Sequence, residues 1–199
     1  MPGRLPAVLL GLLLVAALVL GLDPYDRGDW LLENALVVIV LGVVLAGHRR
    51  RPLSGSAYVA LFAFLLLHEV GAHYTYSQVP WAQWWQALTG VAPAPGRNHF
   101  DRLVHFAYGL LLAPAVADWT AARTPLRGLA LRVVVVALLT TGSALYEMIE
   151  WVAAEVFAGD LGVAYLGTQG DVWDSQKDMV LALAGSLLWA LLPKALSRA

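Results

Sequence analysis

Six apolar stretches alternate with short polar segments along the 199-residue chain. They cover residues 5–22, 30–47, 57–76, 101–119, 128–151 and 177–196. A helix needs about 20 mostly apolar residues to cross a bilayer. The pattern therefore predicts an all-α polytopic membrane protein, a single domain built as a bundle of about six transmembrane helices. The third and fourth stretches reach this length only by including polar residues at one end.

Composition agrees with a membrane protein, because 59% of the residues are hydrophobic and only 14% are charged. Soluble domains carry about 25% charged residues. A net charge of −1 gives no reason to expect a nucleic-acid partner. The sequence contains no cysteine, which excludes disulfides, thiolate metal ligands and a cysteine nucleophile. The lipid bilayer is the expected surrounding, and no oligomeric state follows from these numbers.

The basic residues predict an orientation for the bundle. With both termini in the cytoplasm, nine of the 13 Lys and Arg residues fall on the cytoplasmic side, including the "HRRRP" segment at residues 48–52. This is the distribution that the positive-inside rule describes. The first stretch could instead be a signal peptide, because Arg4 precedes an apolar run. No clear A-x-A cleavage site follows it, so we favour a retained helix.

Ionisable side chains gather at the predicted outer ends of four helices. They are His68, Glu69 and His73 in the third stretch, Asp101, Arg102 and His105 in the fourth, Glu147 and Glu150 in the fifth, and Asp174 and Asp178 at the start of the sixth. Most are three or four residues apart within their helix, so they share a face. His68 and His73 are five apart and would not. Ionisable groups at membrane depth are costly and usually mark function.

Three interpretations of this cluster remain open. In the first, a divalent ion such as Zn, Mn or Fe is held by metal ligands, namely His68, His73, His105, Glu147, Glu150, Asp174 and Asp178. In the second, a metal-free site performs acid–base catalysis, with Asp101, Arg102, His105, Glu147 and Glu150, where Arg102 neutralises anionic charge on the substrate or on Asp174 or Asp178. In the third, the charges form an ion-pair network that only ties helix ends together.

Two long loops flank the cluster. The loop at 74–100 contains Trp81, Trp84 and Trp85, which predict a segment lying at the membrane interface. The loop at 152–177 is rich in glycine, which indicates tight turns. Asn98 and Gln169 are expected to donate or accept hydrogen bonds near the site. Asp29 is interpreted as part of a solvated turn, and Tyr146 as a packing residue.

Four motifs, "GAHYTYSQVP", "RNHFDRLVHF", "YEMIEW" and "LGTQGDVWDSQKDM", together resemble the YjdF-type inner-membrane proteins of bacteria. The resemblance covers about residues 57–192. It implies a multi-pass protein of the bacterial inner membrane and a site position, but no reaction.

A more distant similarity links "DRLVHF", "EMIE" and "GDVWDSQKD" to VanZ-like membrane proteins, which carry comparable motifs in the same order. This similarity implies one functional unit formed by Asp101, Arg102, His105, Glu147, Glu150, Asp174 and Asp178. The sequence departs from that pattern at Glu150, where glutamine is expected. His68, Glu69 and His73 have no counterpart in it.

These patterns favour an outer-face pocket that handles a lipid-linked or amphipathic small-molecule substrate of the cell envelope. Whether such a site would make the protein an enzyme stays open. The alternatives are an ion- or proton-coupled transporter and a non-catalytic structural or accessory membrane protein. A transporter is less favoured, because the cluster lies near one face and the spans lack clear pairs of broken helices.

Overall fold

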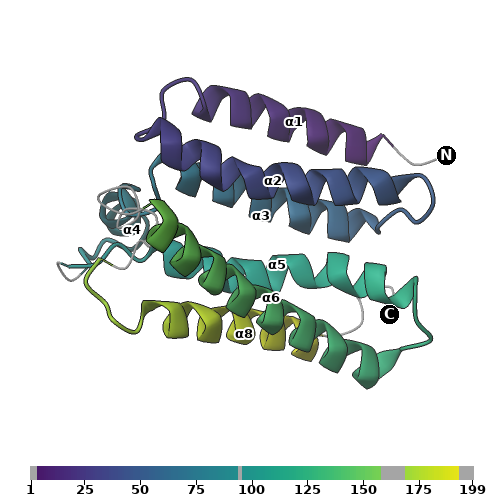
Figure 1. Cartoon of the computed structure of the whole chain (residues 1–199). Coiled ribbons are helices and arrows are strands. Elements are labelled where there is room, and N and C mark those ends of the chain that lie inside the picture. The colour runs from purple at the N-terminus through teal and green to yellow at the C-terminus, as the bar shows by residue number, and fades with distance from the viewer. Residues whose placement is uncertain (1–3, 94–95, 158–168, 193–199) are drawn as a thin grey trace.

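The computed structural model describes residues 4–93, 96–157 and 169–192, and the described part of the chain forms helices without strands (Figure 1). The helices are α1 (Leu5–Leu20), α2 (Arg27–His48), α3 (Gly55–His73), α4 (Trp81–Thr89), α5 (Phe100–Ala121), α6 (Gly128–Phe157) and α8 (Asp174–Leu191). Within the described residues, α2, α3, α5 and α6 are long and apolar enough to cross a membrane. The prediction of an all-α polytopic membrane protein is confirmed.

The two terminal helices differ from these four. Helix α1 is apolar but has only 16 residues, and α8 begins with three charged side chains, Asp174, Lys177 and Asp178. That both also cross the bilayer stays a prediction. The interfacial tryptophans predicted in the 74–100 loop lie on the short helix α4, where Trp84 and Trp85 are 44% and 40% exposed.

Several helix ends differ from the predicted spans. Helix α3 ends at His73 rather than 76, because Thr75 and Tyr76 adopt left-handed φ angles of 49° and 52°, which a helix cannot contain. Helix α6 continues to Phe157, beyond the predicted end at 151. Helix α8 starts at Asp174 instead of 177, since an acidic residue is favourable in a first turn. The predicted end of the last span at 196 lies outside the described residues.

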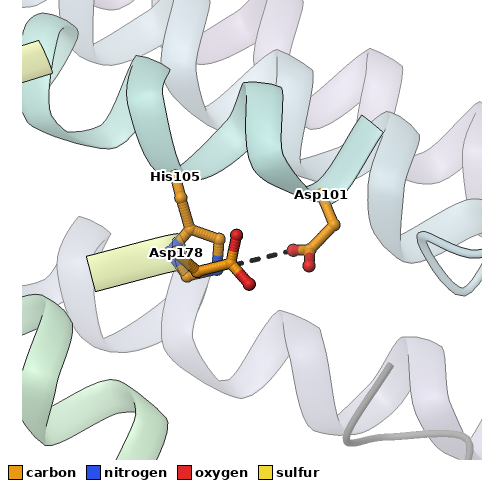
Figure 2. Close-up of side chains that lie close together, drawn as sticks. All are labelled: Asp101, His105 and Asp178. Atoms are coloured by element: carbon orange, nitrogen blue, oxygen red, sulfur yellow. Dashed lines mark ion pairs between the residues drawn. The ribbon is translucent and has the colours of Figure 1, made fainter. Parts of the chain in front are cut away.

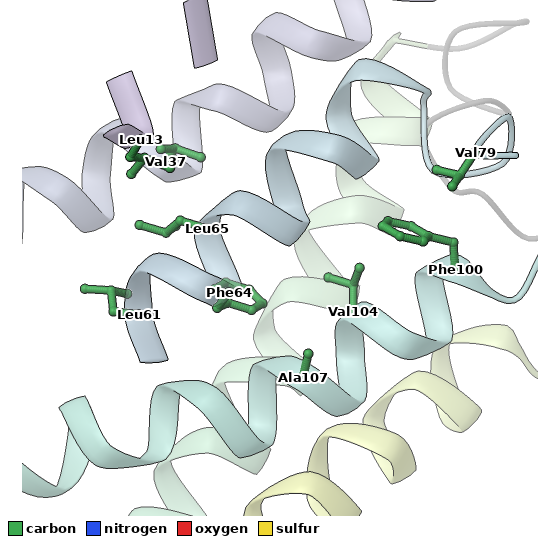
Figure 3. Close-up of a cluster of buried hydrophobic side chains, with 9 residues drawn as sticks. All are labelled: Leu13, Val37, Leu61, Phe64, Leu65, Val79, Phe100, Val104 and Ala107. Carbon is green, nitrogen blue, oxygen red and sulfur yellow. The ribbon is translucent and has the colours of Figure 1, made fainter. Parts of the chain in front are cut away.

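The helices form two layers that meet at α3 and α5 (Figure 1). Helices α1 and α2 pack on α3, while α6 and α8 pack on α5 and on each other. Figure 3 shows the contact between the layers, where Phe64 of α3 points toward Val104 and Ala107 of α5. Burying these apolar side chains fixes the two central helices against each other and sets the frame for the site.

Glycine makes the contact between α5 and α8 unusually close. A Cβ added at Gly109 would lie 1.9 Å from the Ala182 carbonyl oxygen, and one added at Gly185 would lie 2.1 Å from the Phe106 carbonyl oxygen. Small residues let membrane helices approach at backbone distance, where van der Waals packing holds them together. This contact fixes how the start of α8 lies beside α5.

The two ends of the bundle differ in charge. One end, which we call the arginine-rich end, carries the loops at 49–54 and 122–127. There Arg51 donates to the Ala122 carbonyl oxygen, and Arg132 donates to the Ala190 carbonyl oxygen. The other end, which we call the site end, carries α4 and the start of α8 (Figure 1). That the arginine-rich end faces the cytoplasm stays a prediction from the positive-inside rule.

Candidate functional site

A cavity of about 320 Å³ opens near the site end, between α2, α3, α5 and α6 and beside the start of α8. Ligand pockets usually have volumes of about 300–1,000 Å³. Among the described residues its lining includes seven acids and two histidines. These are Asp29, Glu33, Asp101, Glu147, Glu150, Asp174, Asp178, His68 and His105. The cavity thus brings together side chains from five helices that the sequence spreads over 150 positions (29–178).

The closest group in this cavity consists of Asp101, His105 and Asp178 (Figure 2). Asp101 and His105 lie one turn apart on α5, and Asp178 comes from α8. Each offers one ligand atom, and the three atoms lie within 4.8 Å of one another. The His105 Nε2 atom is 3.4 Å from Asp101 Oδ1 and 3.6 Å from Glu147 Oε1. The donor set of one imidazole and two carboxylates suits a divalent metal ion.

A second set of polar groups lines the opposite wall, on α2 and α3. The Nε2 atom of His68 lies 3.3 Å from the backbone carbonyl oxygen of Glu33 and so acts as a donor. His68 Nδ1 is then the acceptor for the Tyr76 hydroxyl, 2.6 Å away. Tyr146 of α6 donates to Glu33 Oε2 at 3.2 Å. The Tyr146 hydrogen bond fixes the Glu33 carboxylate in the cavity, whereas the His68 and Tyr76 side chains are anchored on the Glu33 backbone.

The turn after α3 explains how Tyr76 reaches His68. The left-handed conformation of Thr75 and Tyr76 folds the chain back over the last turn of α3. Gly71 leaves room for the returning ring, because an added Cβ would lie 2.7 Å from it. Residues other than glycine rarely adopt this conformation. The strained turn therefore serves to place the Tyr76 hydroxyl at the site.

Ion pairs cover the mouth of the cavity. Arg97 Nη2 lies 3.2 Å from Asp101 Oδ2 and 2.6 Å from Asp174 Oδ1. Arg102 pairs with Asp171 and approaches Asp174 to 3.8 Å. The sequence predicted Arg102 as a partner for Asp174, Asp178 or a substrate anion, and the structure places it against Asp171 and Asp174. The ion-pair network proposed as the third interpretation thus exists at the mouth, while His105 and Asp178 lie below it.

The loops also meet above the mouth. The backbone N–H of Asn98 donates to Gln169 Oε1 at 2.8 Å, and the Asn98 side chain donates to the carbonyl oxygens of Ser77 and Val79. Asn98 thus forms hydrogen bonds with Gln169 and with the segment after α3, and that the two residues support the site stays a prediction. Residues 158–168 of the predicted glycine-rich loop at 152–177 lie outside the described residues.

The structure does not bring His73 into the cavity. Its Nδ1 atom lies 2.7 Å from the carbonyl oxygen of Leu20, at the end of α1. Glu69, fully buried in α3, does not line the cavity either. The five-residue spacing between His68 and His73 explains the divergence, because these positions lie on different faces of a helix. Of the two, only His68 faces the predicted site.

Four cavity residues were missed or misread in the sequence: Asp29, Glu33, Tyr76 and Tyr146. Asp29 was interpreted as solvated but is 3% exposed, because α2 starts at Arg27 and turns this side chain inward. Tyr146 was interpreted as a packing residue but bonds Glu33. A signal for α2 was present, since Asp29 and Glu33 are four residues apart at the start of an apolar span and so share a face. Tyr76 lies within the "GAHYTYSQVP" motif, but no helical spacing links it to the other cavity residues.

Asp171 allows a prediction about pH. Hydrogen bonds from Lys177 and Arg102 lower the pKa of Asp171 to about 2 from an ordinary value of 3.8. Its folded-state pKa lies below the unfolded value, so its stabilising effect is present above about pH 4 and is lost as the pH falls toward about 2. We therefore expect the melting temperature of Asp171→Asn to fall less than that of the parent over this range, in a detergent solution monitored by tryptophan fluorescence.

The exposed Glu155 supplies the control for this experiment. The Glu155→Gln variant removes one carboxylate elsewhere and should follow the acid profile of the parent. Identical acid profiles for the parent and Asp171→Asn would contradict the role of the Lys177 and Arg102 contacts.

Comparison with known proteins identifies the family of the chain. The chain is 39% identical to the inner membrane protein YjdF of Escherichia coli (strain K12) over 170 residues, which cover 84% of this chain and 78% of that protein. The inner-membrane relative and the apolar helices together support a multi-pass protein of the inner membrane. No solved structure matches the chain. The family model described as "Predicted membrane protein (DUF2238)" matches residues 5–198, and the chain belongs to this family.

Proposed function

We propose that the cavity binds a divalent cation at Asp101, His105 and Asp178 and performs acid–base chemistry on the head group of an amphipathic or lipid-linked envelope substrate. The observation that carries this proposal is the convergence of three ligand atoms within 4.8 Å at the polar end of a cavity. The proposed orientation places this end on the outer face of the inner membrane, because the arginine-rich end then faces the cytoplasm.

The charge of the cavity supports a bound cation. Seven acids line it, and the two arginines at its mouth are engaged with Asp101, Asp171 and Asp174. A buried carboxylate without a compensating charge is strongly destabilising. A cation beside His105 and Asp178 would supply the missing positive charge, and a divalent ion would also polarise an oxygen of the substrate.

Residues around the proposed ligands have roles of their own. Glu147 Oε1 lies 3.6 Å from His105 Nε2 and is placed to take a proton from water or from a substrate hydroxyl. Glu33 faces this group from the opposite wall, where its hydrogen bond from Tyr146 fixes the carboxylate. Two carboxylates on opposite walls would let one group accept a proton while the other donates one.

Metal analysis of the purified protein tests the proposal. We expect about one equivalent of Mn, Fe or Zn per chain by elemental analysis, or on titration of the chelator-treated protein. His105→Gln and Asp178→Asn should each weaken binding by at least about tenfold, because each removes a direct ligand. His73→Gln is the matched control, since His73 lies outside the cavity.

The result also separates the alternative functions. If no divalent ion binds, or if the His105 and Asp178 variants bind it as tightly as His73→Gln, the metal proposal is wrong. A fall in thermal stability without any change in metal content would favour an ion-pair network with a purely structural role.

A further inference from the structure

Four helices, α2, α3, α5 and α6, form the walls of the cavity. Three of the four lines of contact between neighbouring walls, which we call seams, are packed. Helix α2 packs on α3, α3 on α5, and α5 on α6. Among the described helices, α2 and α6 do not form a comparable packed pair, although both line the cavity. The hydrogen bond from Tyr146 to Glu33 bridges this fourth seam near the site end. The seam between α2 and α6 is therefore where the cavity is least enclosed by protein.

The lining changes from polar to apolar with depth, and it does so on two facing helices in the same register. On α2 the lining residues run from Asp29 and Glu33 to Leu36 and Val40. On α5 they run from Asp101 and His105 to Tyr108 and Leu112. Each series spans twelve residues, whose first and last members are about 16 Å apart along the helix at 1.5 Å per residue. The cavity thus has a polar end and an apolar inner end, which we call the apolar arm.

Other walls complete the apolar arm. Phe64 of α3 lines it, and Gly142 of α6 contributes no side chain. A Cβ added at Gly142 would lie 2.4 Å from the Tyr108 hydroxyl, so glycine lets Tyr108 lie along the wall. The Tyr108 hydroxyl donates to the Leu139 carbonyl oxygen at 3.3 Å and is therefore paired within the protein. The Tyr108 side chain thus lines the arm with its apolar ring. The arm therefore suits a hydrocarbon chain and offers few partners to a polar one.

We propose that the α2–α6 seam is a lateral entrance for a membrane lipid. One hydrocarbon chain of the lipid would occupy the apolar arm, and its head group would lie at Asp101, His105 and Asp178. The head-group part of this inference rests on the proposed function, whereas the binding of the chain does not.

The surroundings favour entry from the bilayer over entry from water. Exposed apolar side chains cover the outer surfaces of α2 and α6, including Val38 and Ile39 at 70% and 63% and Leu145 and Ile149 at 54% and 59%. Lipid would therefore contact both sides of the seam. The mouth toward water, by contrast, is crossed by the Arg97 ion pairs and by the loop contact of Asn98.

Photo-crosslinking tests the entrance in the full-length protein. The protein is reconstituted in vesicles of phosphatidylethanolamine and phosphatidylglycerol that contain a trace of phosphatidylethanolamine with a diazirine in one acyl chain. After irradiation, mass spectrometry of peptides locates the attached lipid. We expect attachment at the residues of the apolar arm, Tyr108 and Leu112, in addition to the exposed surface. Attachment confined to exposed surface residues would overturn the proposal.

Two valines on α2 provide a matched pair of variants. Val40 lines the arm, while Val38 is 70% exposed on the outer surface of the same helix. Val40→Phe should fill the arm and reduce attachment at Tyr108 and Leu112 several-fold, whereas Val38→Phe should leave it unchanged. Equal attachment in the two variants would overturn the proposal, provided that both show the parent's melting temperature. Should Val40→Phe be unstable, Leu36→Phe fills the same arm one turn away.

Metal titration of the same variants separates this inference from the proposed function. Val40→Phe should lose arm labelling and keep the parent's metal affinity. Asp178→Asn should lose metal affinity and keep arm labelling. If the arm is labelled in a protein that binds no metal, the lateral entrance stands and the metal site is rejected. If metal binds but the arm is not labelled, the metal site stands and the lateral entrance is rejected.

Discussion

Replacing Gly185 with alanine should lower the free energy of unfolding by about 3 kcal/mol, near the upper end for overpacking a tight contact. The added methyl group would lie 2.1 Å from the Phe106 carbonyl oxygen and 2.9 Å from the Leu110 backbone nitrogen. Backbone atoms cannot rotate away, so α8 must move off α5. Because α8 carries Asp178, the variant should also bind metal more weakly than the parent.

Gly42 of α2 supplies the control for this prediction. A Cβ added there meets nothing within 4 Å, and alanine is favoured over glycine in a helix by about 1 kcal/mol. Gly42→Ala should therefore match or exceed the stability of the parent in a denaturant titration followed by tryptophan fluorescence. Equal stability of Gly185→Ala and Gly42→Ala would show that α5 and α8 are not held by this glycine contact.

The sequence predicted the helices better than their contacts. Hydropathy locates apolar helices because lipid demands long runs without charge, and α2, α3, α5 and α6 follow these runs closely. Hydropathy says nothing of which helices touch. Gly109, Ala113 and Ala117 follow one another at four-residue intervals on α5, a small-xxx-small pattern typical of closely packed membrane helices. The pattern does not say which helix packs there, and only the structure identifies Gly185 of α8 as part of the contact.

The site was predictable to the extent that depth and helical spacing determine it. The depth of a residue in the membrane and its spacing from other residues can both be read along a single helix. These two quantities predicted that Asp101, His105 and Asp178 lie near one another. The spacing of His68 and His73 predicts that they point in different directions from their helix. It does not predict which of them enters the cavity, because the rotation of a helix about its axis is set by its packing against the neighbouring helices. Glu33 was missed although the same depth argument applies to it.

Replacing Arg97 with methionine should destabilise the protein by about 3 kcal/mol, because it breaks a buried ion pair and leaves Asp174 with only the more distant Arg102, 3.8 Å away. The side chains of Arg97 and Asp174 are 9% and 5% exposed, and their charged atoms lie 2.6 Å apart. Thermal and denaturant unfolding would measure the change. The double variant Arg97→Met, Asp174→Leu should recover part of the loss, since it removes both charges of this pair, although Asp101 still loses its contact with Arg97.

Arg102→Met is the contrasting variant, with nearly the same change in side-chain size and charge. Arg102 and Asp171 are 20% and 19% exposed, and Asp171 keeps a second partner in Lys177, 2.6 Å away. Ion pairs contribute less to stability as their exposure to solvent rises, and the contact of Arg102 with Asp174 is the longer one at 3.8 Å, so Arg102→Met should cost less than Arg97→Met. If the two arginine variants are equally stable, the Arg97–Asp174 pair does not hold the segment before α5 against the start of α8 at the mouth. The larger effect of Arg97→Met would instead identify this pair as the structural part of the cluster, and would leave His105 and Asp178, which lie below it, free for binding.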